Sequence, residues 1–326
     1  MGKVRMVVFG QIVLGPAGCG KSTYCAALQA HCASSHGMAR RVMHVINLDP
    51  AAESFAYEPL ADVRELVNVD EVAEEVELGP NGALVWAMEY LVDNLDWLTD
   101  IIQEQLVEGD YVLFDCPGQI ELYTHYNIMR RITNALVELG MRLCSVFLID
   151  SSYALEASKF MGGSLSAMSA MVQLELPHVS VLSKMDLLLR RPELSDSQTH
   201  ADAGHVETKV ADDSYRLARL FLHMMSSDVE LDEPEMKLEL ELALRPALAV
   251  YQGKESTEEQ SGFEKLHCAI SDLLSETSIV QFYPLDLKQD EVIQDLIVQI
   301  DLIVQYDEVA ELRIGDVEEK DPDEDV

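Results

Sequence analysis

The sequence predicts an α/β protein with a mostly parallel sheet flanked by helices. Three observations support this prediction. Short apolar runs alternate with longer segments of helical spacing along most of the chain. A glycine-rich loop stands between the first apolar run and the first helical segment. Each further polar motif follows directly after an apolar run, and the carboxyl ends of parallel strands share the edge where open α/β sheets bind ligands.

The glycine-rich loop matches the phosphate-binding pattern G-x-x-x-x-G-K-[ST]. Its residues are Gly15, Pro16, Ala17, Gly18, Cys19, Gly20, Lys21, Ser22 and Thr23. A buried strand is expected over 11–14 and a helix over 22–32, which disfavours the alternative of a chance turn. Glycines let backbone N–H groups point at phosphate oxygens, and the helix N-terminus adds its positive end. Lys21 would contact the β- and γ-phosphates and the Ser22 hydroxyl Mg²⁺. We therefore expect the fold of a P-loop NTPase.

The remaining elements are expected in the same alternation. Further strands are predicted over 41–48, 111–114, 143–149, 179–182 and 279–282. Helices are predicted over 61–66, 70–76, 83–106, 128–139, 155–174, 263–274 and 291–304. This gives an N-terminal extension (1–10), a nucleotide-binding domain (11–306) with a polar helical insertion at about 190–260, and an acidic tail (307–326) that we expect to be disordered.

Composition narrows the classes of partner. The chain has 326 residues with 58 acidic and 23 basic side chains, a net charge of −35. Such a chain should repel nucleic acid and anionic membranes, so we expect neither as a direct partner. The six cysteines form no C-x-x-C pair, and no secretory leader is evident, which favours reduced thiols in a cytosolic protein.

A second motif, Asp115-Cys-Pro-Gly-Gln119, follows a buried strand. In P-loop NTPases an aspartate at this place holds Mg²⁺, and a nearby glutamine orients the attacking water. Glu121 could accept the proton of that water or could be a solvated residue at a helix start. Asp49, at the end of the strand over 41–48, could meet the γ-phosphate or the metal, or could cap the next helix.

The third motif, Ser183-Lys184-Met185-Asp186, resembles the guanine-reading pattern [NT]KxD. The carboxylate of Asp186 could accept hydrogen bonds from guanine N1–H and N2–H₂, a pair of donors that adenine lacks, and the stem of Lys184 would pack on the base. Ser183 stands where the pattern has Asn or Thr. The residues alone leave a chance K-x-D at a strand end as an equal alternative.

Taken together and in order, these motifs resemble the GPN-loop GTPases. The residues that carry the resemblance are Gly15–Thr23, Asn47–Glu53, Gly79-Pro80-Asn81, Asp115–Glu121 and Ser183–Asp186. The resemblance implies GTP and Mg²⁺ as ligands, with Asp49, Asp115, Gln119 and Glu121 lining the metal and water site. It also implies a dimer, with itself or with a paralogue, in which Asn81 reaches the partner's γ-phosphate in place of an arginine finger.

The family resemblance has further implications. Asp62 and Arg64 would belong to a switch region, and the segment Phe282–Leu285 would lie near the base. The expected role is assembly and nuclear import of RNA polymerase II, with the first GPN-loop paralogue as usual partner and a cytoplasmic location with shuttling to the nucleus. Because an asparagine amide carries no full charge, slow hydrolysis is expected.

Two other hypotheses remain open at this stage. A P-loop kinase would need an acceptor pocket and basic lid residues, whereas the insertion is acidic. A binding scaffold would hold nucleotide with little turnover.

Overall fold

The computed structural model describes residues 7–34, 41–155, 157–189, 269 and 282–306. Seven strands form one sheet in the order β3-β2-β4-β1-β5-β6-β7. The pairs β1/β4, β1/β5, β2/β3, β2/β4 and β6/β7 are all parallel. The predicted α/β class with a parallel sheet is confirmed.

The strands are β1 (Phe9–Leu14), β2 (Met43–Asn47), β3 (Pro59–Asp62), β4 (Tyr111–Asp115), β5 (Arg142–Asp150), β6 (His178–Ser183) and β7 (Phe282–Pro284). The α-helices are α1 (Lys21–Ser34), α2 (Val69–Glu75), α3 (Pro80–Asp93), α4 (Leu95–Gln105), α5 (Glu121–Thr124), α6 (Ile128–Leu139), α7 (Ala157–Leu174), α8 (Met185–Leu189) and α12 (Asp290–Val304). Short 3₁₀ turns cover Val63–Glu65 and Ser151–Leu155.

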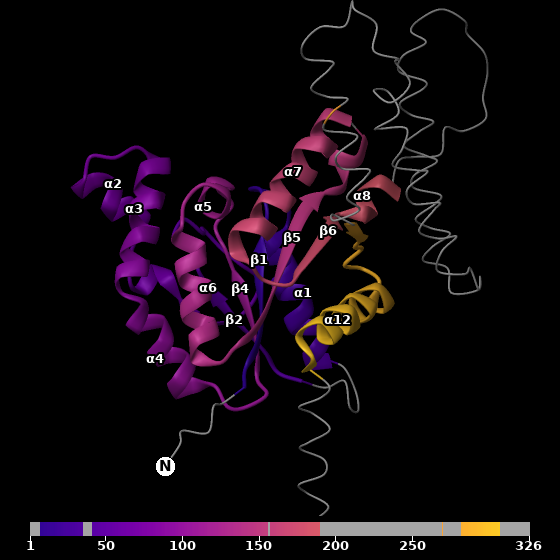
Figure 1. The fold of residues 1–326 in the computed structure, drawn as a ribbon, viewed down its shortest axis with the longest axis horizontal. Coiled ribbons are helices and arrows are strands. Elements are labelled where there is room, and N and C mark those ends of the chain that lie inside the picture. The colour runs from indigo at the N-terminus through magenta and orange to yellow at the C-terminus, as the bar shows by residue number, and fades with distance from the viewer. Residues whose placement is uncertain (1–6, 35–40, 156, 190–268, 270–281, 307–326) are drawn as a thin grey trace, which may run out of the picture. The chain divides into compact units, whose positions relative to one another are not determined.

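The described residues fall into two compact units. The first contains the chain up to Leu148, together with Ser169–Val179 and the part of α12 from Ile293 onward. In this unit α3, α4 and α6 lie on one side of the strands β1, β2 and β4, and α1 and α12 lie on the other (Figure 1). The second unit contains Ile149–Met168 and the described part of 180–292.

The central strands are apolar because both faces of the sheet are covered. Every residue of β1 and of β4 is buried. Gln11 is the polar exception within β1, and its side chain is satisfied: it donates to the Tyr111 hydroxyl (3.0 Å) and accepts from the Tyr24 hydroxyl (2.7 Å). This buried hydrogen-bond chain joins α1, β1 and β4 without leaving an unpaired amide.

Two predictions in the N-terminal half of the chain are wrong, one about where a strand begins and one about the type of an element. Strand β1 begins at Phe9 rather than Gln11, because Phe9 already pairs with Tyr111 of β4 and Arg142 of β5. The helix predicted over 61–66 is instead the end of β3 followed by the 3₁₀ turn Val63–Glu65. Pairing of β3 with β2 overrides the helical spacing of this short segment.

The long helix predicted over 83–106 is two helices that meet at Asn94. The Asn94 side chain donates to the Tyr90 carbonyl (2.8 Å) and so competes with the helical backbone. Helix α3 also begins earlier than predicted, at Pro80, with Gly79 as its N-cap. The other predicted elements agree with α1, α2, α6, α7, α12 and strands β2, β4, β5 and β6 within a few residues.

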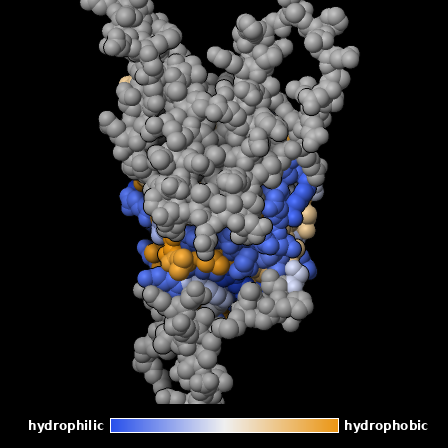
Figure 2. Space-filling view, turned by 90° about the vertical axis from the view of Figure 1, so that its right-hand side faces the viewer, coloured by the Kyte–Doolittle hydropathy of each residue, from blue (hydrophilic) through white to orange (hydrophobic). Residues whose placement is uncertain are grey.

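Several predictions lie outside the described residues. These are the insertion at about 190–260, the helix over 263–274, residues 279–281 of the last strand and the acidic tail. Within the described part of the chain, no helix combines the length and the apolarity that a membrane span requires. The exposed apolar residues of α12 are Val298, Leu302 and Ile303, and Figure 2 shows an orange cluster on the side of the molecule that carries this helix.

Arg41 anchors the C-terminal half of α12 by polar contacts, in addition to the apolar residues that this helix buries. The Arg41 guanidinium lies against the rings of Tyr111 (4.7 Å) and Tyr306 (4.6 Å). Its Nη1 also donates to Oδ1 of Asp301 (2.9 Å), a residue with 8% of its surface exposed. A carboxylate this buried depends on its cation.

We therefore expect Arg41→Ala to lower the free energy of unfolding by about 3–5 kcal/mol, because Asp301 would lose its buried cation. Urea denaturation at neutral pH measures the change. Arg131→Ala is the matched control, since the ion pair of Arg131 with Asp93 is exposed, and it should cost less than about 1 kcal/mol. Similar losses in the two variants would contradict the assignment of Arg41 as the anchor of α12.

Candidate functional site

The glycine-rich loop connects β1 to α1, as predicted. Gly15, Gly18 and Gly20 have φ angles of 139°, 78° and 95°, a backbone region that side chains rarely adopt. A Cβ at Gly15 would also lie 2.1 Å from the Leu148 carbonyl oxygen. The loop is thus built for glycine, and the N-terminus of α1 directly after it favours an anion.

Lys21 opens α1 and folds back over the loop. Its Nζ donates to the carbonyl oxygens of Gly15 (3.0 Å) and Pro16 (3.3 Å), and the residue is only 8% exposed. The N–H of Gly15 donates to the Tyr123 hydroxyl (3.2 Å), which ties the loop to α5. A phosphate in the loop would offer Lys21 stronger, charged acceptors than these carbonyls.

The predicted metal-binding motif packs directly on the phosphate loop. Asp115 is the last residue of β4, and Gly118 follows in the turn. A Cβ on Gly118 would lie 2.8 Å from Cα and 3.0 Å from Cβ and N of Ala17. Only a residue without a side chain permits this approach, so the structure brings the first two motifs together in one unit.

Asp115 is a buried carboxylate, 2% exposed. Burial raises the pKa of Asp115, and hydrogen bonding from Ser22 and Tyr57 acts in the opposite direction. The Tyr57 hydroxyl donates to Oδ2 at 2.9 Å. The other oxygen, Oδ1, is buried and makes no hydrogen bond of normal geometry. A buried carboxylate oxygen without a hydrogen bond is costly, so Oδ1 is a candidate ligand for a cation or an acceptor for a further donor.

The donor set around Asp115 fits Mg²⁺. Hydroxyl and carboxylate oxygens are its preferred ligands, and it usually takes few of them from protein, with water and substrate phosphates completing the shell. Among the described residues, no group of three or more His, Cys, Asp or Glu could hold a metal on its own. Ser22 and Asp115 together with a nucleotide could do so, whereas a cage made of protein alone could not.

Asp49 lies at the start of the loop after β2, and the pKa of this carboxyl is raised by burial. The charges of Lys21 and Arg64 lower it in part, and Asp49 in turn raises the pKa of Asp115. Oδ1 of Asp49 accepts from the Ala51 N–H at 3.0 Å, which is a local turn contact. The structure thus places Asp49 within electrostatic range of Lys21 and Asp115.

The predicted switch residues hold this loop in place. Arg64 donates through Nε to both carboxylate oxygens of Asp62 (3.0 and 2.9 Å) and through Nη1 to the Ala52 carbonyl (2.8 Å). Asn47 donates to Asp62 (2.8 Å) and to the Asp49 carbonyl (3.1 Å). Burial would raise the pKa of Asp62, but the hydrogen bonds from Arg64 and Asn47 bring it below its usual value.

Gln119 and Asn81 meet within one chain. The Gln119 Nε2 donates to Asn81 Oδ1 at 2.7 Å, and Asn81 is exposed at the first turn of α3. Asn81, which the resemblance assigns to the partner's γ-phosphate, is therefore a neighbour of Gln119 in its own chain, which their sequence spacing did not indicate. Glu121 is exposed at the first position of α5. Its placement is compatible with both sequence-based alternatives, and its role stays a prediction.

The base-reading motif lies in the second unit. Ser183 ends β6 and donates to the Ile149 carbonyl (3.1 Å), and Lys184 adopts a left-handed φ of 58°. The Lys184 Nζ contacts Oδ2 of Asp150 at 2.9 Å. Burial alone would raise the pKa of Asp150, but the contact with Lys184 and the N–H of Ser152 lower it. This ion pair fixes the lysine stem that was predicted to pack on a base.

The segment Phe282–Leu285 lies beside this motif, in agreement with the resemblance. Strand β7 pairs with β6, and the N–H of Met185 donates to the Leu285 carbonyl (3.3 Å). The Asp186 carboxylate is ion-paired with Lys288. A guanine base would therefore contact an Asp186 carboxylate whose negative charge is already balanced by Lys288.

Tyr57 and Lys288 are the residues that sequence reasoning missed. Each contacts a predicted site carboxylate from a distant part of the chain, 58 positions from Asp115 and 102 positions from Asp186. Neither residue belongs to a motif, and single-sequence patterns carry no information on such long-range pairs. The site roles predicted for the motif residues remain predictions.

The sequence of this chain is similar to known proteins over almost its whole length. The family model described as "Conserved hypothetical ATP binding protein" matches residues 13–229. The chain is 39% identical over 312 residues to GPN-loop GTPase 3 of Dictyostelium discoideum, covering 96% of this chain and 90% of that protein. It is 39% identical over 308 residues to GPN-loop GTPase 3 of Danio rerio, covering 94% and 90%.

A solved structure shares the fold. The apo form of a GTPase from Pyrococcus abyssi superposes with a TM-score of 0.60 at 20% identity, covering 93% of this chain and 98% of the other. With the full-length similarity to the two relatives and the ordered motifs of the site, these matches show that the chain belongs to the GPN-loop GTPase family.

Proposed function

We propose that this GTPase binds GTP with Mg²⁺, hydrolyses it slowly to GDP and phosphate, and works as a dimeric switch in the assembly and nuclear import of RNA polymerase II. The observation that supports hydrolysis best is the contact of the loop that bears Asp115 and Gln119 with the phosphate loop at Ala17. A phosphate cradle, a buried carboxylate and a water-orienting amide thus converge at one place.

The chain's own residues would act mainly by positioning. The loop N–H groups and Lys21 hold the phosphates, and Ser22 and Asp115 hold Mg²⁺, with Asp49 in electrostatic range. Mg²⁺ would neutralise charge on the phosphate oxygens. Gln119 orients the water that attacks the γ-phosphorus as the bond to the β-phosphate oxygen breaks. Glu121 is the candidate acceptor of the water proton.

We propose that GTP hydrolysis is slow because the side chains available beside the attacking water are neutral amides. Gln119 and Asn81 can orient a water molecule, but neither brings a positive charge to the charge that develops in the transition state. A charged arginine finger is worth roughly 10³–10⁵-fold in rate in other GTPases. Asn81 of a partner subunit would replace it only in part.

The choice of base rests on Asp186. Relatives are named GTPases, whereas the family model is described as ATP binding. A carboxylate can accept both N–H donors of guanine and finds no such pair on adenine, so we propose GTP. Lys184, held by Asp150, would cover the base.

We expect Asp186→Ala to lower the affinity for a GTP analogue about 100-fold with no loss for an ATP analogue, because unpaired base donors are costly. Calorimetry with both analogues measures this. Lys288→Ala is the matched control, because it removes the same ion pair but keeps the carboxylate, and it should keep the GTP preference. Equal affinity of the wild-type chain for the two analogues would contradict guanine reading.

The surface of α3 supports the proposed dimer. Trp86 and Tyr90 are exposed on this helix, one turn apart, with their rings stacked at 5.5 Å. Leu78, also exposed, packs over Gly82 at the same helix end as Asn81. Large exposed apolar and aromatic side chains, here on the helix whose first turn carries Asn81, are typical of an interface core.

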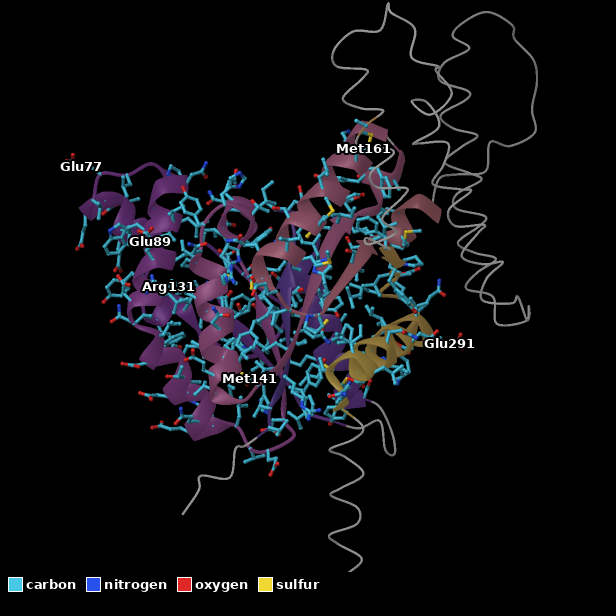
Figure 3. All side chains as sticks on the ribbon, viewed as in Figure 1. Glu77, Glu89, Arg131, Met141, Met161 and Glu291 are labelled. Atoms are coloured by element: carbon cyan, nitrogen blue, oxygen red, sulfur yellow. The ribbon has the colours of Figure 1, made fainter. Side chains whose placement is uncertain are left out.

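The charges around these apolar side chains favour a paralogue over a second identical chain. Glu77 and Glu89 are exposed on α3 and the turn before it, and Figure 3 shows both on this side of the molecule. Asp93 is exposed as well, but it is paired with Arg131 of α6. Two copies would bring like charges together, which costs affinity. We therefore propose a GPN-loop paralogue with a less acidic surface as the partner.

Replacing both Trp86 and Tyr90 with alanine is expected to weaken association with the partner at least 100-fold, because buried aromatic anchors carry most interface energy. Sedimentation of the mixed proteins measures this. Leu302→Ala, which removes a more exposed apolar residue from α12, should have no effect. An unchanged dissociation constant in the double variant would exclude the exposed aromatic side chains of α3 as the interface core.

The proposed cellular role rests on the family resemblance. We expect depletion of the chain to leave RNA polymerase II subunits in the cytoplasm, because unassembled subunits would not be imported. Imaging of a tagged subunit checks this, with re-expression of the wild type as rescue. Rescue by Gln119→Leu, with hydrolysis abolished, would favour a nucleotide-holding scaffold over a switch.

A further inference from the structure

Tyr57 contacts the proposed metal site from outside every motif. Its hydroxyl donates to Oδ2 of Asp115 at 2.9 Å. Both residues are buried, with 5% and 2% of their surfaces exposed. A hydrogen bond between a phenol and a carboxylate that are both shielded from water is stronger than one at the surface.

The position of the Tyr57 ring is fixed by its neighbours. The ring stacks on Phe55 with the centroids 4.4 Å apart and the planes 2° from parallel. Phe55 also contacts the Arg64 guanidinium, 4.8 Å from the ring centroid, and Arg64 is held by Asp62. The hydroxyl therefore reaches Asp115 from a braced side chain rather than from a free rotamer.

The contact leaves the two oxygens of Asp115 in different states. Oδ2 is used by Tyr57, whereas Oδ1 is buried without a hydrogen bond of normal geometry. Ser22, the other proposed metal ligand, interacts with the same carboxylate. A carboxylate anchored through one oxygen presents the other in a single orientation, which is what outer-shell partners do for metal ligands.

We propose that Tyr57 is a positioning residue that anchors Asp115 through Oδ2 so that Oδ1 serves the Mg²⁺ of the bound nucleotide. The inference rests on the proposed function, since it assumes that nucleotide and Mg²⁺ bind here. It goes beyond that function by naming a residue of the loop after β2 that sets metal affinity. The same contact links the order of this loop to the metal site, because Tyr57 and Asp49 both lie in the loop between β2 and β3.

Tyr57→Phe tests this role, because it removes one oxygen and keeps the ring stack. The probe is a non-hydrolysable GTP analogue, bound by the full chain in calorimetry at a series of Mg²⁺ concentrations and in EDTA, at one pH. We expect the Mg²⁺ concentration for half-maximal effect to rise about tenfold. Affinity in EDTA should stay within about twofold of wild type, because the phosphate loop is unchanged.

Tyr24→Phe is the matched control. The Tyr24 hydroxyl is also buried and hydrogen-bonded, but its acceptor is Gln11. Thermal unfolding should show similar small losses for both variants, while only Tyr57→Phe shifts the Mg²⁺ response. An equal Mg²⁺ shift in both variants would overturn only the positioning role of Tyr57, and so would a loss of affinity for Tyr57→Phe that is as large in EDTA as in Mg²⁺. If binding by the wild type does not depend on Mg²⁺, both the positioning role and the proposed metal site are overturned.

Discussion

The parallel register of three central strands is the constraint on which the site depends. Val13 of β1 and Asn47 of β2 are both paired with Asp115 of β4, so the three strands end at one level of the sheet. The phosphate loop, the loop after β2 and the turn after β4 therefore leave the same edge. Backbone hydrogen bonds set this alignment, and the missing side chain of Gly118 lets two of the loops touch.

The second constraint is a buried carboxylate at that edge of the sheet, because its charge must be compensated there. Asp115 is removed from water and forms no ion pair with a cation in the described part of the chain, and the rise in its pKa reflects that cost, which the charge of Lys21 offsets in part. Donors from α1 and from the loop after β2 compensate in part. That loop is itself tied down by polar contacts, above all the fork between Arg64 and Asp62. The order of the loop and the charge state of the site are thus linked through these hydrogen bonds and through Phe55, which contacts both Arg64 and Tyr57.

Sequence patterns were sufficient to predict those elements whose structure depends on residues close to one another in the chain. The glycine-rich loop, the fully buried strands and the amphipathic helix over 128–139 were predicted because periodicity and motif spacing encode them directly. The segment 61–66 was mistaken for a helix because its strand character comes from pairing with β2, which a local window does not contain. The break at Asn94 was missed for a related reason: asparagine signals a break only through the hydrogen bond that its side chain makes.

The charge balance of the site explains why a switch with slow turnover fits this chain. The protein carries a net charge of −35, yet it is proposed to bind a triphosphate. At the phosphate loop the compensating charge comes from backbone amides and Lys21, while Arg64 is already engaged by Asp62. The metal must then supply much of the remaining neutralisation, and the amides of Gln119 and Asn81 can orient water but add no charge. Under the proposed function, such a site would keep its triphosphate longer than one with a charged finger, and this delay would give an assembly step time to finish before the switch resets.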